Sequence, residues 1–161
     1  MEGVWGDIYS TIRAEFADVP NIKELTRLLL RLTLAVALGG LIGWEREAAG
    51  KAAGLRTHMM VALGSALFVL VPLQAGVPLA DMSRVLQGLT AGIGFIGAGA
   101  IIKQASKDDV SESDVRGLTT AASIWTVAAI GVACGLGREM TAVVATVFSL
   151  VILQLLYAFK K

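Results

Sequence analysis

Charge is almost absent from the long apolar runs of this sequence. Only 17% of the 161 residues are charged and 55% are hydrophobic, and neither residues 57–74 nor residues 117–136 contain Asp, Glu, Lys or Arg. Runs of this length suffice to cross a hydrocarbon layer about 30 Å thick at roughly 1.5 Å per helical residue. Because a bilayer interior offers the backbone no water, such runs must be helical. The chain is therefore predicted to be an integral membrane protein.

Other scarce residues exclude further classes of protein. The net charge of +1 leaves no clustered basic surface for nucleic acid, so no nucleic-acid partner is expected. The single cysteine, Cys134, cannot form an intramolecular disulfide. We interpret it as a small buried apolar residue, with a redox-active thiol as the alternative.

The residues needed for catalysis or cation pumping are also missing. The apolar cores contain no carboxylate, whereas proton-coupled and divalent-cation transporters usually hold Asp or Glu within the membrane. No His-Glu-x-x-His or Gly-x-Ser-x-Gly pattern occurs. We expect no enzyme activity, no cofactor and no resident metal. The acidic residues in 108–114 are interpreted as a solvated connection, with attraction of Mg²⁺ as the alternative.

The distribution of apolar residues predicts an all-α, polytopic membrane helix bundle with five transmembrane helices and an N-terminal amphipathic interfacial helix. Residues 1–21 form the amphipathic segment, in which Trp5, Tyr9 and Ile12 recur at helical spacing. Residues 22–161 form the transmembrane domain, and Asn21 with Glu24 reads as a capping box at its start. The crossing helices are expected at residues 22–44, 57–73, 81–103, 117–135 and 139–159.

Basic residues at the helix ends predict the orientation. Positive charge concentrates after the first and third crossings and at the end of the chain, against two arginines in the opposing loops, so the N-terminus is expected outside and the C-terminus in the cytoplasm. The cytoplasmic residues of this count are Arg46, Lys51, Arg56, Lys103, Lys107, Arg116, Lys160 and Lys161. Lys23, Arg27 and Arg31 share one face of the first helix, where they either extend toward the headgroups or form a basic stripe facing a polar cavity.

Glycines crowd the third crossing helix. Small residues let membrane helices approach closely, which predicts that this helix packs at the centre of the bundle. A break in the helix that exposes its backbone to a cavity is the alternative. The predicted packing residues are Gly88, Gly92, Gly94, Gly97 and Gly99.

Hydroxyl side chains form a stripe on the fourth crossing helix. Thr119, Ser123 and Thr126 fall within one narrow arc, with Thr120 beside it. They either bond within the bundle or contact a ligand, and both interpretations place the stripe inward.

Polar residues from distant stretches are predicted to converge at the cytoplasmic face. This convergence indicates either a functional polar cluster or ordinary charge pairing at helix ends, and a proton-linked role for His58 is a weaker hypothesis. The candidate residues are Glu45, Arg46, Arg56, Thr57, His58, Arg116, Thr119, Thr120 and Ser123.

Four motifs in this order resemble the MgtC/SapB family of bacterial inner-membrane proteins. They are Gly-Gly-Leu-Ile-Gly-Trp-Glu-Arg-Glu at 39–47, Ala-Gly-Leu-Arg-Thr-His at 53–58, the glycine-rich run at 92–101 and Val-Arg-Gly-Leu-Thr-Thr-Ala-Ala-Ser-Ile-Trp at 115–125. The resemblance covers about residues 28–155 and implies five helices with an outside N-terminus. It also implies a multi-pass protein of the bacterial inner membrane.

The family resemblance implies a role in membrane physiology. Its best-known members are associated with survival at low magnesium, with virulence inside host cells and with restraint of the F-type ATP synthase. Longer members continue into a soluble cytoplasmic domain, which is expected to be absent here. The leading hypothesis is a non-enzymatic regulator of membrane energetics or ion homeostasis that acts through membrane helix contacts. The alternative is a transporter or channel for Mg²⁺, another ion or a small solute. Expected partners are membrane lipids, a second copy, with a dimer favoured, and a membrane protein such as the F-type ATP synthase.

Overall fold

The computed structural model describes residues 2–105 and 117–158, which are helical apart from short connections and contain no strand. This confirms the expected all-α class. The chain divides into two units, Met1–Leu30 and Arg31–Lys161, which are described in turn. The expected division after residue 21 stays a prediction.

The first unit contains α1, Glu2–Glu15, and the start of α2, Ile22–Ala48. The side chains of residues 3–15 are exposed, including the aromatic rings of Trp5 and Tyr9, which leaves them available to a membrane surface. The Asn21 carboxamide oxygen accepts a 3.0 Å hydrogen bond from the Glu24 backbone N–H, which confirms half of the predicted capping box. The Glu24 carboxylate pairs with Arg27 at 2.7 Å.

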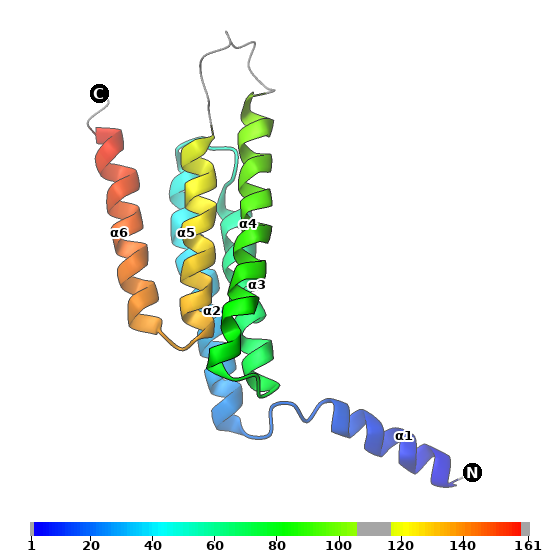
Figure 1. The fold of residues 1–161 in the computed structure, drawn as a ribbon. Helices are drawn as coiled ribbons and strands as arrows, with labels where there is room; N and C mark the ends of the chain where they lie inside the picture. The colour runs from blue at the N-terminus through cyan, green and yellow to red at the C-terminus, as the bar shows by residue number, and fades with distance from the viewer. Residues whose placement is uncertain (1, 106–116, 159–161) are drawn as a thin grey trace. The chain divides into compact units, whose positions relative to one another are not determined.

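The second unit is a bundle of five helices (Figure 1). After Arg31 of α2 come α3 (Leu55–Gln74), the 3-10 turn η1 (Leu79–Asp81), α4 (Met82–Ala105), α5 (Leu118–Gly135) and α6 (Glu139–Ala158). Among the described residues, four helices are long and apolar enough to cross a membrane, and a shorter apolar helix covers Glu139–Gln154. The five predicted crossings are therefore present as helices. The first runs past its expected end and carries Glu45, Arg46 and Glu47 in its last turn.

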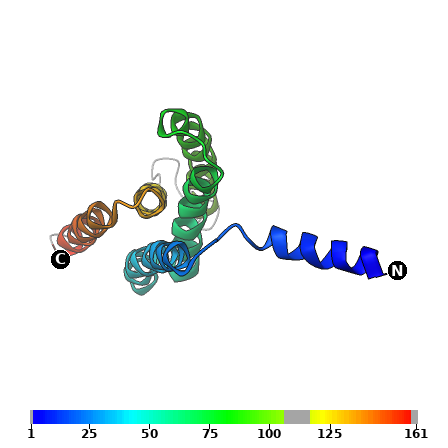
Figure 2. The ribbon, with the colours of Figure 1, turned by 90° about the horizontal axis from the view of Figure 1, so that it is seen from below.

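Helix α5 occupies the centre of this unit. It packs against α3, α4 and α6 (Figure 2), and 50% of its residues are buried, against 11% for the span that contains α4. The prediction that the glycine-rich helix forms the centre is therefore wrong. The predicted alternative, a break in that helix, is also absent, because α4 is continuous from Met82 to Ala105.

The close helix contacts depend on other glycines. A Cβ added at Gly43 of α2 would lie 2.8 Å from the Leu55 Cα, and one at Gly39 would lie 2.7 Å from the Ala62 Cβ. On α5, a Cβ at Gly131 would overlap the Ala62 carbonyl oxygen, and one at Gly135 would lie 2.7 Å from the Ala66 carbonyl oxygen. Two Gly-x-x-x-Gly pairs therefore bring the backbones of α2 and α5 against α3.

Arg31 of α2 contacts both α5 and α6 at the end of the bundle where α5 ends and α6 begins. The Arg31 guanidinium donates a 3.2 Å hydrogen bond to the Gly135 carbonyl and lies 3.6 Å from the Glu139 carboxylate. Gly137, with φ of +72°, allows the Arg138 N–H to bond the Ala133 carbonyl at 2.8 Å. These bonds satisfy carbonyls that the end of α5 leaves unpaired. Arg31 thus turns toward a helix end.

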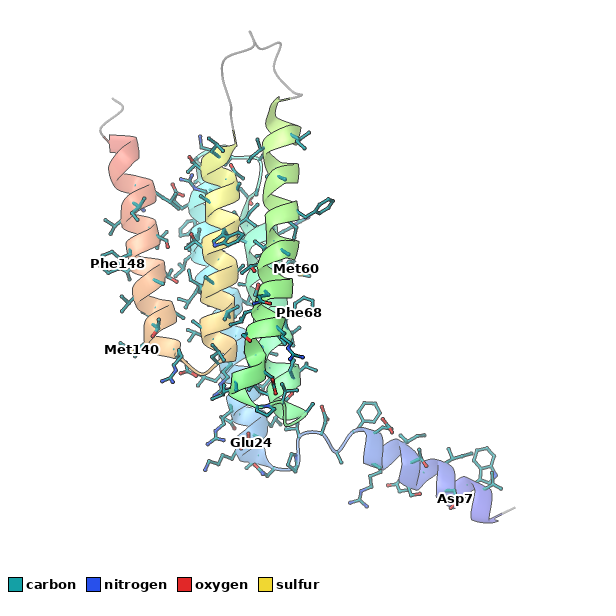
Figure 3. The ribbon with its side chains drawn as sticks, in the orientation of Figure 1. Asp7, Glu24, Met60, Phe68, Met140 and Phe148 are labelled. Atoms are coloured by element: carbon teal, nitrogen blue, oxygen red, sulfur yellow. The ribbon has the colours of Figure 1, made fainter. Side chains whose placement is uncertain are left out.

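The outer surface of the bundle is apolar. Met60 and Phe68 on α3 and Met140 and Phe148 on α6 are more than 60% exposed and point away from the helix contacts (Figure 3). The interior consists mainly of small and β-branched side chains, including Cys134, which is free and fully buried as predicted. An apolar exterior over helices of this length is the surface that a bilayer requires.

Candidate functional site

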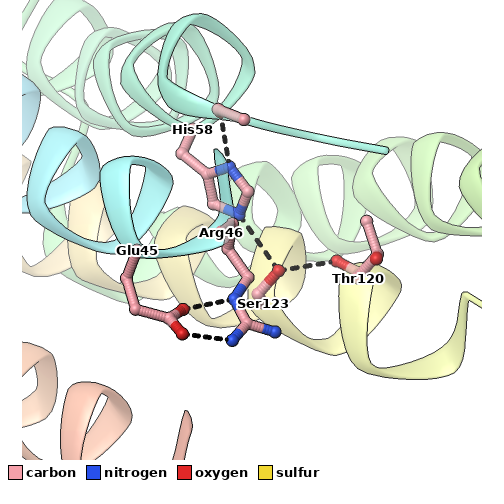
Figure 4. A network of polar contacts seen from close by, with 6 residues as sticks. Glu45, Arg46, His58, Thr120 and Ser123 are labelled. Atoms are coloured by element: carbon pink, nitrogen blue, oxygen red, sulfur yellow. Dashed lines mark hydrogen bonds and ion pairs between the residues drawn. The ribbon is translucent and has the colours of Figure 1, made fainter. Parts of the chain in front are cut away.

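The candidate site lies where α2 ends and where α3 and α5 begin (Figure 4). We call it the polar cluster and define it as Glu45, Arg46, His58, Thr120 and Ser123. All but Glu45 are buried, and Glu45 is partly buried. Polar groups at this depth of a membrane protein are costly unless they bond to one another.

The ionic part of the polar cluster is formed by adjacent residues. The Arg46 guanidinium donates two hydrogen bonds to the two carboxylate oxygens of Glu45, through Nε and through Nη2, the latter at 2.6 Å. The side chain of Arg46 is 4% exposed and that of Glu45 is 16% exposed. A bidentate pair compensates the burial of the guanidinium, which would be strongly unfavourable alone.

The neutral part joins α3 to α5. The His58 imidazole lies 2.8 Å from the Gly54 carbonyl oxygen through Nδ1 and 3.0 Å from the Ser123 hydroxyl oxygen through Nε2. The Ser123 hydroxyl is in turn 2.8 Å from the Thr120 carbonyl oxygen. Figure 4 shows these contacts as one chain of dashed lines from His58 to Thr120.

Glu47, which is not among the predicted candidate residues, fixes the turn before α3. The Leu55 backbone N–H donates a 2.8 Å hydrogen bond to Glu47 Oε2, which pairs a donor that the start of the helix leaves free. A Cβ added at Gly54 would lie 2.5 Å from the same oxygen, so the Glu47 carboxylate would have to leave this position to admit it. Glu47 was visible in the motif, but its role depends on the path of the connection.

Three other candidate residues that the structure describes lie outside the polar cluster. Arg56, Thr57 and Thr119 are exposed. Arg116 lies outside the described residues. Arg56 and Thr57 lie in the first turn of α3 and Thr119 in that of α5, so they lie at the same end of the bundle as the polar cluster without joining its contacts. The functional role of the candidate residues stays a prediction.

The inward arc of α5 differs from the predicted hydroxyl stripe. Thr119 is exposed and Thr126 is partly exposed, and the Thr126 hydroxyl bonds the Ala122 carbonyl of its own helix at 2.9 Å. The prediction that the stripe faces inward is thus wrong for both threonines. Ser123 and Thr120 face inward because the buried face of α5 is rotated by about one residue from the predicted face.

Most of the α4 glycines do not pack within the chain. Among the described residues, and apart from the backbone of α4 itself, no atom lies within 4 Å of a Cβ added at Gly88, Gly92 or Gly99. At Gly97 the Ala121 Cβ lies at 3.5 Å, and at Gly94 the Trp125 ring lies at 4.0 Å. We name Gly88, Gly92 and Gly99 the α4 glycine face. The sequence predicted packing at this face. It did not predict packing at the Gly-x-x-x-Gly pairs of α2 and α5, although their four-residue spacing is typical of helix contacts.

Grooves between α4 and α5 are lined by apolar residues. They flank Trp125 and have volumes of about 190 and 360 Å³, with Thr90 contributing the one hydroxyl among their lining side chains. Within residues 2–105 and 117–158, no group of three His, Cys, Asp or Glu side chains could hold a metal ion. The acidic stretch at 108–114 lies outside the described residues.

These features define a polytopic α-helical membrane protein with a largely buried polar cluster at one end. Residues 32–161 match the MgtC family, and the chain belongs to that family. No solved structure matches the chain significantly.

The chain resembles several bacterial relatives along most of its length. It is 45% identical over 133 residues to protein SrpB of Synechococcus elongatus, which covers 79% of this chain and 73% of that protein. It is 38% identical over 136 residues to the putative magnesium transporter YhiD of Escherichia coli K12, covering 80% and 60%. It is 43% identical over 136 residues to protein MgtC of Brucella abortus, covering 83% and 53%. The chain thus spans little more than half of the MgtC relative.

Proposed function

We propose that this protein is a non-enzymatic regulator of the bacterial inner membrane, with its N-terminus outside and its C-terminus in the cytoplasm. It acts on membrane energetics or ion homeostasis by helix contact with a membrane partner. The F-type ATP synthase and a second copy of the chain, as a dimer, are the candidate partners, in a bilayer of membrane lipids. The observation that supports this proposal most is the uncovered α4 glycine face.

The α4 glycine face has the geometry of a helix-packing surface. At about 100° per residue, Gly88, Gly92 and Gly99 fall within roughly 40° of one another. The buried residues Ile93 and Gly97 lie on the opposite side, toward α5. Glycines that meet nothing within their own chain leave room for the backbone of another helix. The glycine pairs of α2 and α5 are already in such contacts, and α3 has the single uncovered Gly64, so among the described helices α4 is the one with a row of uncovered glycines.

The polar cluster favours a regulator over an enzyme. Among the described residues, its hydrogen bonds run between its own members or to backbone carbonyls of the same bundle. An active site needs a cavity that admits a substrate next to its reactive groups. The grooves beside Trp125 are instead lined by apolar side chains from α4 and α5.

Replacing Gly92 with leucine should reduce partner recovery by about tenfold or more, because the side chain would fill the space for the partner helix. The measurement is co-purification from bacterial membranes of the ATP synthase and of a second, differently tagged copy. Gly64→Leu on α3 is the matched control, since no atom lies within 4 Å of a Cβ at Gly64 either. Equal recovery of both partners with the Gly92 and Gly64 variants would remove the basis of the proposal.

A transporter or channel is the second candidate, favoured by the name of the relative YhiD, a putative magnesium transporter. Purified protein in liposomes distinguishes the two functions. Regulation by contact predicts no flux of Mg²⁺, H⁺ or anions above protein-free vesicles. Flux that is saturable and lost in a polar-cluster variant would establish transport instead.

A further inference from the structure

His58 is the one histidine of the chain, and it is fully buried between α2, α3 and α5. Its Nδ1 lies 2.8 Å from the Gly54 carbonyl oxygen. A carbonyl oxygen only accepts hydrogen bonds, so Nδ1 must carry a proton to make this contact. The protonation of the ring is then decided at Nε2, which faces α5.

Two acceptors compete for one hydroxyl proton beside Nε2. The Ser123 hydroxyl lies 3.0 Å from Nε2 and 2.8 Å from the Thr120 carbonyl oxygen. If Nε2 is unprotonated, Ser123 must donate to it and cannot also donate to Thr120. If Nε2 is protonated, it donates to Ser123, and the hydroxyl donates to Thr120. Three hydrogen bonds are in question: His58 to Gly54, His58 to Ser123, and Ser123 to Thr120. All three form at the same time only when the imidazole is doubly protonated.

The charged groups of the polar cluster come from α2. Arg46 and Glu45 lie in the same polar cluster as the ring (Figure 4), and the Glu47 carboxylate lies against Gly54, which accepts the Nδ1 bond. Along Leu118–Gly135, α5 carries no Asp, Glu, Lys, Arg or His. Within residues 82–102 of α4 the one charged residue is Arg84, in the turn that starts the helix at the other end of the bundle. On α3 itself, Arg56 is exposed. Among the residues that the structure describes, Glu45 is a counter-charge for a protonated His58, and it is shared with Arg46.

We propose that His58 is a proton-binding site whose occupancy sets the direction of the hydrogen bond between α3 and α5. One proton from water at the membrane surface binds Nε2, the His58–Ser123 bond reverses, and the Ser123 hydroxyl turns to the Thr120 carbonyl. No other bond forms or breaks. The inference goes beyond the regulatory function and does not depend on the identity of a partner.

Nitrogen NMR of the whole protein in lipid bilayers tests this site directly. With ¹⁵N-labelled histidine, the single imidazole gives one pair of ring signals, followed from about pH 8 to about pH 5, the range in which histidine ordinarily titrates. At the upper end we expect a protonated Nδ1 and a pyridine-type Nε2. At the lower end both nitrogens should be of the N–H type. A ring protonated at Nε2 alone at high pH, or signals that do not change with pH, would overturn the proposal.

The Ser123→Ala variant then tests whether protonation of Nε2 reverses the His58–Ser123 hydrogen bond or only charges the ring. Without the hydroxyl, the pyridine-type Nε2 signal should move downfield of the wild-type position, because it no longer accepts a hydrogen bond. Thr126→Val is the matched control, since it removes a hydroxyl of the same helix that bonds only the Ala122 carbonyl. An Nε2 signal that is the same in Ser123→Ala and wild type would refute the switch. If the Ser123 variant fails to fold, the wild-type titration still decides between the outcomes.

Discussion

Replacing Gly131 with alanine should lower the free energy of unfolding by about 2–4 kcal/mol. The new Cβ would overlap the Ala62 carbonyl oxygen and lie 2.9 Å from the Ser65 Cβ. Backbone atoms cannot rotate away as a flexible side chain does, so α5 must separate from α3. Because α5 also contacts α4 and α6, the displacement spreads through the second unit.

Denaturant unfolding of the purified protein in detergent, followed by circular dichroism, measures this effect. Gly88→Ala is the matched control, because a Cβ at Gly88 meets no atom within 4 Å. That variant should be neutral, or more stable by up to about 1 kcal/mol, since alanine has the higher helix propensity. Similar stabilities of the two variants would mean that α3 and α5 are not in backbone contact at Gly131.

Glu45→Gln should cost about 2–3 kcal/mol of stability, the second largest effect that we expect. The substitution keeps the shape of the side chain but leaves the guanidinium of Arg46, which is 4% exposed, without its counter-charge. An unpaired charge at this burial is much less stable than either a complete ion pair or an apolar replacement. The loss should therefore exceed that of any exposed ion pair in the chain.

The same unfolding measurement distinguishes this cause from lost packing. Glu24→Gln is the control, because its pair with Arg27 is exposed and should change stability by roughly 0–1 kcal/mol. Adding Arg46→Met to Glu45→Gln should recover part of the loss, since it removes the unpaired charge while retaining an apolar side chain. A double variant less stable than Glu45→Gln alone would assign the effect to packing instead.

Much of the candidate site was predictable because its members lie at helix ends. Hydropathy located the turns at which α2 ends and α3 and α5 begin, and consecutive antiparallel helices bring these ends together. Glu45, Arg46, His58 and Ser123 were therefore expected near one another. Arg56 and Thr57 lie at the same end, but whether a residue at a helix end faces inward depends on how the helix is rotated about its axis.

The rotation of a helix could not be read from this sequence. Small and apolar residues cover several faces of α4 and α5, so no strong contrast marks the buried side. The Thr119, Ser123 and Thr126 arc was a reasonable choice on spacing alone. The tertiary structure instead turns Thr120 and Ser123 inward, where they meet His58.

The sequence alone determined the helices, their apolar surface and their ends, because these depend on local properties such as hydropathy, capping residues and the need to pair backbone groups in a membrane. Only the tertiary structure decided which glycines are packing residues. A glycine has no side chain to reveal its neighbour, so its role depends on what lies opposite. At Gly131 that is the backbone of α3, whereas at Gly92 no described residue outside α4 has an atom within 4 Å of an added Cβ.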